Sequence, residues 1–136
     1  MTLPSGAGTL GSMRILVVDD SDLVRQLAQD ALEDAGHEVQ GVRSVEEVAE
    51  LRDSGAINSF DLILMDVSMP QLFGDDVALV LRQNPSFRAK IFLFSGLEET
   101  ELAERAAEAK CDGYFCKQLG LEQLVERIAQ LAPTGQ

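Results

Sequence analysis

Five side chains in this sequence of 136 residues have the chemical types that phosphate and metal chemistry require, and all of them follow or end short apolar runs. In chain order they are Asp19, Asp20, Asp66, Ser95 and Lys117. Three carboxylates and one ammonium leave a net charge of −2, and like charges ~4 Å apart repel by on the order of 1–4 kcal/mol per pair at moderate dielectric. Such a cluster needs a divalent cation, and all-oxygen ligands select a hard one, Mg²⁺ or Mn²⁺.

A carboxylate in such a site can act as a nucleophile and form an aspartyl phosphate. The cation and Lys117 would bind the equatorial oxygens of the transferred group, and Ser95 would hydrogen-bond the product phosphate. Taken singly, each residue also has a structural explanation, because an Asp pair after a strand often caps a helix and a lone Asp often lies in a turn. Their joint occurrence at four strand ends favours a role in phosphate and metal chemistry over these structural explanations.

The elements that must position these side chains alternate between apolar runs and amphipathic segments. Strands are predicted, from continuous or short apolar runs, at Ile15–Val18, Glu38–Val42, Leu62–Met65, Ile91–Phe94 and Tyr114–Cys116. Helices are predicted, from one-sided apolar spacing and an S-x-x-E capping box at Ser44, over Asp22–Ala35, Ser44–Asp53, Asp75–Arg82, Glu98–Ala109 and Leu121–Leu131.

This alternation predicts an α/β fold, a flavodoxin-like, doubly wound parallel sheet of five strands in the order 2-1-3-4-5 with five helices. In open parallel sheets, binding sites form at the carboxyl ends of the strands. The five polar side chains should therefore share one crevice.

Composition excludes several other classes of protein. The chain has 11 Lys and Arg against 23 Asp and Glu, a net charge of −12, so direct nucleic-acid binding is not expected. No apolar run approaches the ~20 residues of a membrane span. Cys111 and Cys116 have C-x4-C spacing, not the C-x2-C spacing of metal and redox motifs, and they are far in sequence from the single histidine, His37. They are interpreted as reduced thiols in or near a strand, in a reducing, cytoplasmic compartment.

The two ends of the chain are expected to lie outside the folded unit. Residues 1–12 are small, polar and glycine-rich, without the pattern of a signal peptide, and are predicted to be a disordered extension. Residues 13–131 are predicted to form one domain, and residues 132–136 a short tail with no effector domain after it.

Four segments carry a resemblance to a known family. Residues 15–21 (ILVVDDS), 62–70 (LILMDVSMP), 92–96 (FLFSG) and 112–117 (DGYFCK) resemble the receiver domain of response regulators, including the stand-alone chemotaxis regulators. The resemblance runs from Met13 to about Leu131. It implies a phosphoprotein of bacterial two-component signalling, which catalyses only its own aspartyl phosphorylation and dephosphorylation and is not an enzyme in the usual sense.

The resemblance implies a role for each matching position. Asp66 would accept the phosphoryl group from a histidine kinase in a Mg²⁺-dependent reaction. Asp19 and Asp20 would hold the metal together with Asp66 and the backbone carbonyl of Ser68. Lys117 would pair with the phosphate.

The resemblance also implies a switch. Ser95 would be its hydroxyl and Tyr114 its aromatic ring, and the surface that changes would be helix 4, strand 5 and helix 5, roughly Glu98–Leu131. Partners would be a sensor histidine kinase or phosphotransfer protein and a downstream protein target or effector domain. A homodimer that forms on phosphorylation is also compatible with the family, as is either a stand-alone regulator or one receiver of a longer protein.

Two positions depart from the family pattern. Gln118 stands where proline, often with a cis bond, usually follows the lysine, so the loop is either trans and different in shape or strained. Phe73 replaces the usual acidic residue in the stretch from Met69 to Gly74. Gln118 is the main support for an alternative, a pseudo-receiver that binds partners without phosphorylation. An aspartyl phosphohydrolase lacks its D-x-D motif here, and a nucleotide-binding domain lacks its glycine-rich loop after the first strand.

Overall fold

The computed structural model describes residues 12–67, 80–84 and 87–131. Its strands are β1 (Arg14–Val18), β2 (Glu38–Val42), β3 (Leu62–Met65), β4 (Lys90–Ser95) and β5 (Gly113–Cys116). They form one parallel sheet in the order β2-β1-β3-β4-β5, which confirms the predicted fold class and strand order. The expected boundaries of the domain, the extension and the tail stay predictions, because residues 1–11 and 132–136 lie outside the described part.

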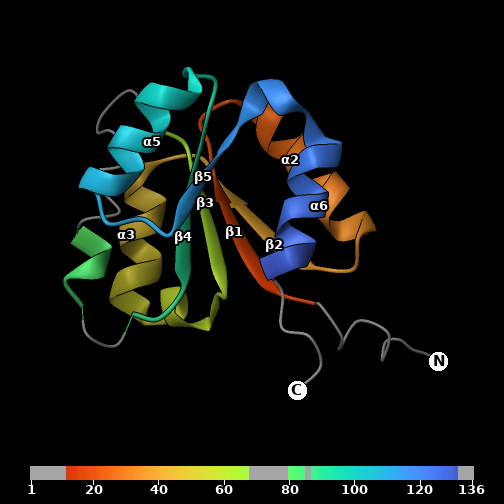
Figure 1. The fold of residues 1–136 in the computed structure, drawn as a ribbon. Helices are drawn as coiled ribbons and strands as arrows, with labels where there is room; N and C mark the ends of the chain where they lie inside the picture. Colours follow the sequence, from red (N-terminus) through yellow and green to blue (C-terminus); the bar gives the residue numbers. More distant parts are fainter. Residues whose placement is uncertain (1–11, 68–79, 85–86, 132–136) are drawn as a thin grey trace.

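Helices cover both faces of the sheet (Figure 1). They are α2 (Asp22–Asp34), α3 (Val45–Ser54), α5 (Glu99–Glu108) and α6 (Leu121–Leu131). Residues 80–82 are also helical and lie at the end of the helix predicted over Asp75–Arg82, whose other residues fall outside the described ranges. Two 3₁₀ turns, η1 (Ala56–Ser59) and η2 (Lys117–Leu119), were not predicted, because such short turns show no helical periodicity.

The continuous apolar runs are explained by a sheet that is buried on both faces. In β1, Ile15 and Val17 belong to the core under α2 and α6, whereas Leu16 and Val18 belong to the core under α3 and α5. Side chains alternate between the faces of a strand, so a strand covered on both sides needs an apolar residue at every position. None of the helices in the described part of the chain combines the length and apolar composition needed to cross a bilayer.

The single histidine, His37, lies at the amino-terminal ends of β1 and β2, opposite the strand ends that carry the polar side chains. His37 is 7% exposed, and its Nδ1 accepts a hydrogen bond from the backbone N–H of Met13 at 3.1 Å. Burial lowers the pKa of His37 below its ordinary value of 6.5. A protonated Nδ1 could no longer accept this bond, so the neutral imidazole is the form that stabilises the start of β1.

We expect His37 to make the protein less stable as the pH falls. Its folded pKa lies below its unfolded pKa, so between the two values the unfolded chain binds more protons. The contribution of His37 to the free energy of unfolding is therefore complete above about pH 6.5, and it declines as the pH drops through that value toward the folded pKa. Urea unfolding at pH 7.5 and 5.5 should show a smaller loss of unfolding free energy for His37→Gln than for the wild type. Equal losses in the two proteins would contradict this assignment.

Candidate functional site

The carboxyl ends of the strands bring the predicted side chains to one edge of the sheet. Asp19 follows β1, Asp66 follows β3, Ser95 ends β4 and Lys117 follows β5. The parallel register aligns these ends, because Val18 pairs with Met65, Met65 with Leu93, and Ser95 with Cys116. The prediction that the carboxylates and the lysine share one crevice is confirmed by the distances below.

The three carboxylates form a compact group. Asp19, Asp20 and Asp66 can each offer one oxygen such that all three oxygens lie within 4.8 Å of one another. Asp19 is fully buried and Asp66 is 4% exposed, whereas Asp20 is exposed. Two carboxylates therefore line the base of the crevice and one lies at its mouth. This spacing is short enough for a single cation to contact all three groups, and mutual repulsion favours such a cation.

Lys117 offsets part of this charge. Its Nζ lies 2.8 Å from Asp19 Oδ2 and 3.8 Å from Asp66 Oδ1, and 5.3 Å from the centroid of the Phe94 ring. Asp19 Oδ2 is buried, and among the described residues it makes no hydrogen bond beyond this ion pair. The group keeps a net charge of −2 even with Lys117 included, and such a charge favours a hard divalent cation.

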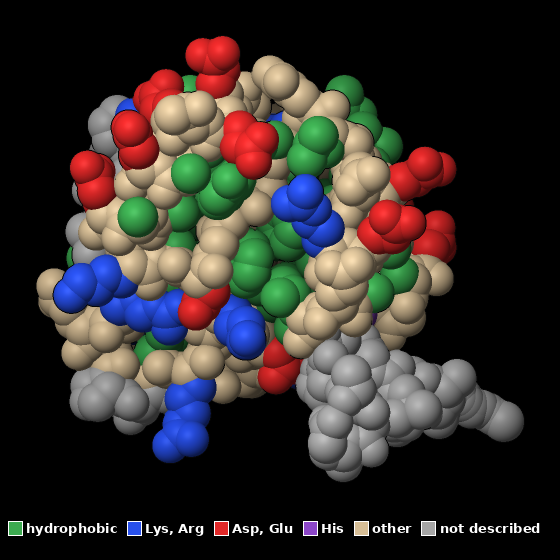
Figure 2. Space-filling model, viewed as in Figure 1, with side chains coloured by type: hydrophobic (Ala, Val, Ile, Leu, Met, Phe, Trp, Pro, Cys, Tyr) green, Lys and Arg blue, Asp and Glu red, His purple; other side chains and the backbone are tan. Residues whose placement is uncertain are grey.

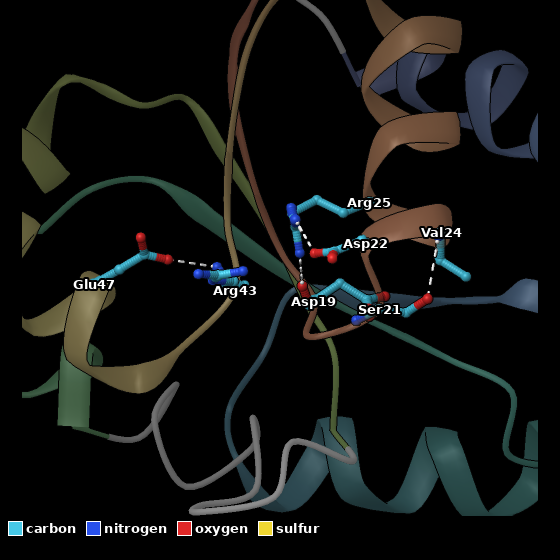
Figure 3. Close-up of polar contacts among 7 residues, drawn as sticks. All are labelled: Asp19, Ser21, Asp22, Val24, Arg25, Arg43 and Glu47. Atoms are coloured by element: carbon cyan, nitrogen blue, oxygen red, sulfur yellow. Dashed lines mark hydrogen bonds and ion pairs between the residues drawn. The ribbon is translucent and has the colours of Figure 1, made fainter.

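The turn after β1 shows that the Asp pair is not simply a helix cap. Ser21 caps α2, since its Oγ accepts the N–H of Val24 at 3.3 Å (Figure 3). The Asp19 side chain instead accepts the N–H of Ser21 at 2.9 Å through Oδ1, and its other oxygen, Oδ2, pairs with Lys117. The helix-cap explanation of Asp19 and Asp20 is therefore wrong.

Arg25 supports this turn and was missed by the sequence reasoning. Its guanidinium donates to the backbone carbonyl of Asp19 at 2.8 Å and pairs with Asp22, which lies one helical turn earlier (Figure 3). The hydrogen bond and charge of Arg25 hold the pKa of Asp22 below its ordinary value. The spacing of Asp22 and Arg25 on one helix face was the only available signal, and it does not reveal the contact with Asp19.

The predicted switch residues lie on one face of the sheet. Ser95 is buried, and its Oγ accepts the N–H of Leu97 at 3.2 Å. Tyr114 is half-buried and donates its hydroxyl to Glu99 Oε2 at 3.0 Å. Because Leu93 pairs with Tyr114 and Ser95 with Cys116, Ser95 and Tyr114 are diagonal neighbours on adjacent strands.

The loop after Lys117 takes the trans alternative. Every peptide bond among the described residues is trans, and Lys117–Leu119 forms η2. The Gln118 side chain donates from Nε2 to the Gly96 carbonyl at 3.2 Å, so the residue in the usual proline position ties this loop to the loop after Ser95. Ser68 and Phe73, the other positions of interest, lie outside the described residues.

The two cysteines, Cys111 and Cys116, are not joined by a disulfide bond. Cys116 is the last residue of β5. Burial, and then the nearby Glu99 carboxylate, raise the pKa of the Cys116 thiol. The thiol is therefore protonated at neutral pH and is a poor metal ligand or nucleophile.

The fold and the crevice together define a flavodoxin-like α/β domain with a cation-accepting acidic pocket. Residues 15–129 match the family model of the response regulator receiver domain. The chain is 34% identical over 121 residues to the gliding motility regulatory protein of Myxococcus xanthus and 34% identical over 123 residues to the response regulator GacA of Pseudomonas viridiflava. These matches cover 88% and 85% of this chain, but only 15% and 53% of those proteins.

Solved structures agree with this assignment. The chemotaxis response regulator CheY4 of Vibrio cholerae superposes with a TM-score of 0.76 at 25% identity, over 87% of this chain and 97% of that one. The Mn²⁺-bound form of the response regulator Rcp1 shares the fold, with a TM-score of 0.70 at 23% identity over 88% of this chain and 91% of that one.

The chain therefore belongs to the response regulator receiver domain family of two-component signalling. It is a receiver domain whose acidic pocket is made by Asp19, Asp20 and Asp66 with Lys117, and it is not a conventional enzyme.

Proposed function

We propose that this domain accepts a phosphoryl group on Asp66 from a sensor histidine kinase or a phosphotransfer protein. One observation carries the proposal: Asp66 directly follows the central strand β3 and is buried, with the Lys117 ammonium 3.8 Å from its Oδ1 and two further carboxylates within reach of a shared cation. This arrangement presents one nucleophilic carboxylate, one cation for the incoming phosphate, and ligands for a metal.

In the proposed reaction, a carboxylate oxygen of Asp66 attacks phosphorus, and the bond between phosphorus and the donor atom breaks. Lys117 pairs with the phosphoryl oxygens and limits repulsion between them and Asp19. The Ser95 hydroxyl then hydrogen-bonds the bound phosphate. Asp19, Asp20, Asp66 and the backbone carbonyl of Ser68 would hold Mg²⁺ or Mn²⁺, which supplies neutralisation of the phosphate charge when it is bound.

The surface proposed to respond consists of α5, β5 and α6. A hollow of about 360 Å³ lies between β5 and the end of α6, and Tyr114 is among its lining residues together with Phe115 and Arg127. Figure 2 shows apolar side chains in the middle of this face of the molecule and acidic side chains toward its top. A movement of Tyr114 would reshape this hollow, so it is a suitable place for a downstream protein or a second receiver to bind.

The remaining partner assignments follow from family and charge. The net charge of −12 argues against direct contact with nucleic acid. A kinase donor and reduced cysteines both fit a cytoplasmic location. The proposed output is contact with a protein target or an effector domain, including a homodimer formed on phosphorylation.

The proposal is tested with acetyl phosphate and intact-mass measurement. We expect a phosphate-sized mass gain in the presence of Mg²⁺ and none when EDTA replaces it. A receiver already known to label is treated in parallel as the positive control. If the folded wild type gains no mass from acetyl phosphate or from a phosphorylated histidine donor, the alternative of a phosphorylation-independent pseudo-receiver is favoured; the departure at Gln118 is the observation that keeps it open.

A further inference from the structure

We propose that Glu99 is a positioning residue, which holds Tyr114 in its unphosphorylated arrangement through their hydrogen bond and thereby opposes the switch. The inference rests on the proposed function and deepens it, because it names a residue that contributes to the free-energy difference between the unphosphorylated and the phosphorylated states. None of the family motifs described above contains Glu99.

The hydrogen bond joins two elements that the switch would move relative to each other. Tyr114 lies in the edge strand β5, and its ring packs against the core under α3 and α5. Glu99 is the first residue of α5, and its Oε2 accepts the Tyr114 hydroxyl at 3.0 Å. The bond also raises the pKa of Tyr114, which shows that the contact favours the protonated phenol that donates it.

The link to the phosphoryl site is short. Only Gly96, Leu97 and Glu98 separate Ser95 from Glu99, and the Gly96 carbonyl is held by the Gln118 side chain at 3.2 Å. If Ser95 moves toward a phosphoryl group on Asp66, this loop must follow and carry the start of α5 with it. Because Tyr114 lies on the neighbouring strand, such a shift changes the distance between its hydroxyl and Glu99.

The energetic consequence follows from linkage. A contact made only in the unphosphorylated state must be broken before the phosphorylated state forms, so it weakens the binding of any phosphoryl mimic. Removing the contact should therefore tighten that binding. For one hydrogen bond to a carboxylate at a solvent-exposed position, we expect about a 3- to 10-fold effect.

The chain offers its own spectroscopic probe, because Tyr114 is the single tyrosine and there is no tryptophan. Intrinsic fluorescence therefore reports on Tyr114 alone, and a carboxylate that accepts the phenol hydrogen quenches it. We expect the wild type to brighten when Mg²⁺ and beryllofluoride, a stable mimic of the aspartyl phosphoryl group, are added. Glu99→Ala should already be bright without them, and Glu99→Gln, which keeps a neutral acceptor, should be intermediate.

Affinity supplies the second measurement. The thermal unfolding midpoint, followed by circular dichroism against beryllofluoride concentration at saturating Mg²⁺, gives the apparent affinity of each variant. We expect tighter binding for Glu99→Ala and for Tyr114→Phe, with no further gain in the double variant. Glu104→Ala, which removes an exposed carboxylate from the same helix, is the matched control and should bind like the wild type.

The outcomes separate the two proposals. If the wild type binds beryllofluoride but Glu99→Ala behaves like Glu104→Ala, or if the effects of Glu99→Ala and Tyr114→Phe simply add, the role of Glu99 is overturned and the proposed function stands. If the folded wild type does not bind beryllofluoride, both are overturned.

Discussion

Replacing Asp66 with asparagine is expected to abolish the mass gain that acetyl phosphate and Mg²⁺ produce in the wild type. The amide has nearly the same shape as the carboxylate but is not a nucleophile toward phosphorus. Asp19 and Asp20 remain in Asp66→Asn, so the experiment distinguishes attack by Asp66 from attack by the other two members of the cluster. The expected effect is complete loss of labelling, measured by intact mass and then by peptide mapping of the wild-type adduct.

The matched control for this prediction is Asp34→Asn, which makes the same chemical change at an exposed position at the far end of α2. It should label like the wild type. A circular dichroism melt must show that Asp66→Asn is folded, because Asp66 is nearly buried. Labelling that persists in folded Asp66→Asn at the wild-type level would show that another residue accepts the phosphoryl group.

Replacing Lys117 with alanine should separate metal binding from phosphoryl transfer. The change takes the charge of the group from −2 to −3 and removes a cation that lies 2.8 Å from Asp19 Oδ2. A divalent cation then meets less competition, so its affinity should rise, by a few-fold at a partly solvated site. The labelling rate should fall by about 10²–10³-fold, as is typical when one group that stabilises transition-state charge is lost.

Two measurements on the same protein test this separation. Metal affinity is obtained from the shift of the thermal midpoint with Mg²⁺ concentration, and the rate from the time course of mass gain at saturating Mg²⁺. Lys90→Ala, which removes an exposed lysine at the start of β4, at the end of the strand away from the acidic pocket, should leave both quantities unchanged. A parallel loss of metal affinity and rate in Lys117→Ala would contradict the proposed role and would mean that the lysine mainly organises the carboxylates.

Most of the fold could be read from the chain because its signals are local. Leu62–Met65 is a continuous apolar run, and it is β3 to the residue. Ser44 and Glu47 predicted a helix start, and the Ser44 hydroxyl does accept the Glu47 N–H at 3.2 Å. The strand ends were less accurate: β4 runs from Lys90 to Ser95, one residue beyond the apolar run at each end. Pairing with Leu62 and Cys116 sets these limits, and pairing partners are not visible in an apolar pattern.

The candidate site was predictable for a related reason. Polar residues at the ends of parallel strands must meet at one edge of the sheet, so Asp19, Asp66 and Lys117 could be placed together once the strand order was known. The order itself followed from the alternation of strands and helices and from the handedness of their connections. Residue types and strand positions thus determined which groups gather, but not their distances.

Three side-chain contacts near the site could be known only from tertiary packing. Arg25 reaching the Asp19 carbonyl, Gln118 reaching the Gly96 carbonyl, and Tyr114 reaching Glu99 each join residues from different elements or loops. Helix and strand propensities act over a few neighbouring residues, whereas these bonds depend on side-chain rotamers and on the separation of elements after packing. A sequence pattern therefore specifies the crevice, and three-dimensional packing specifies how its loops are held.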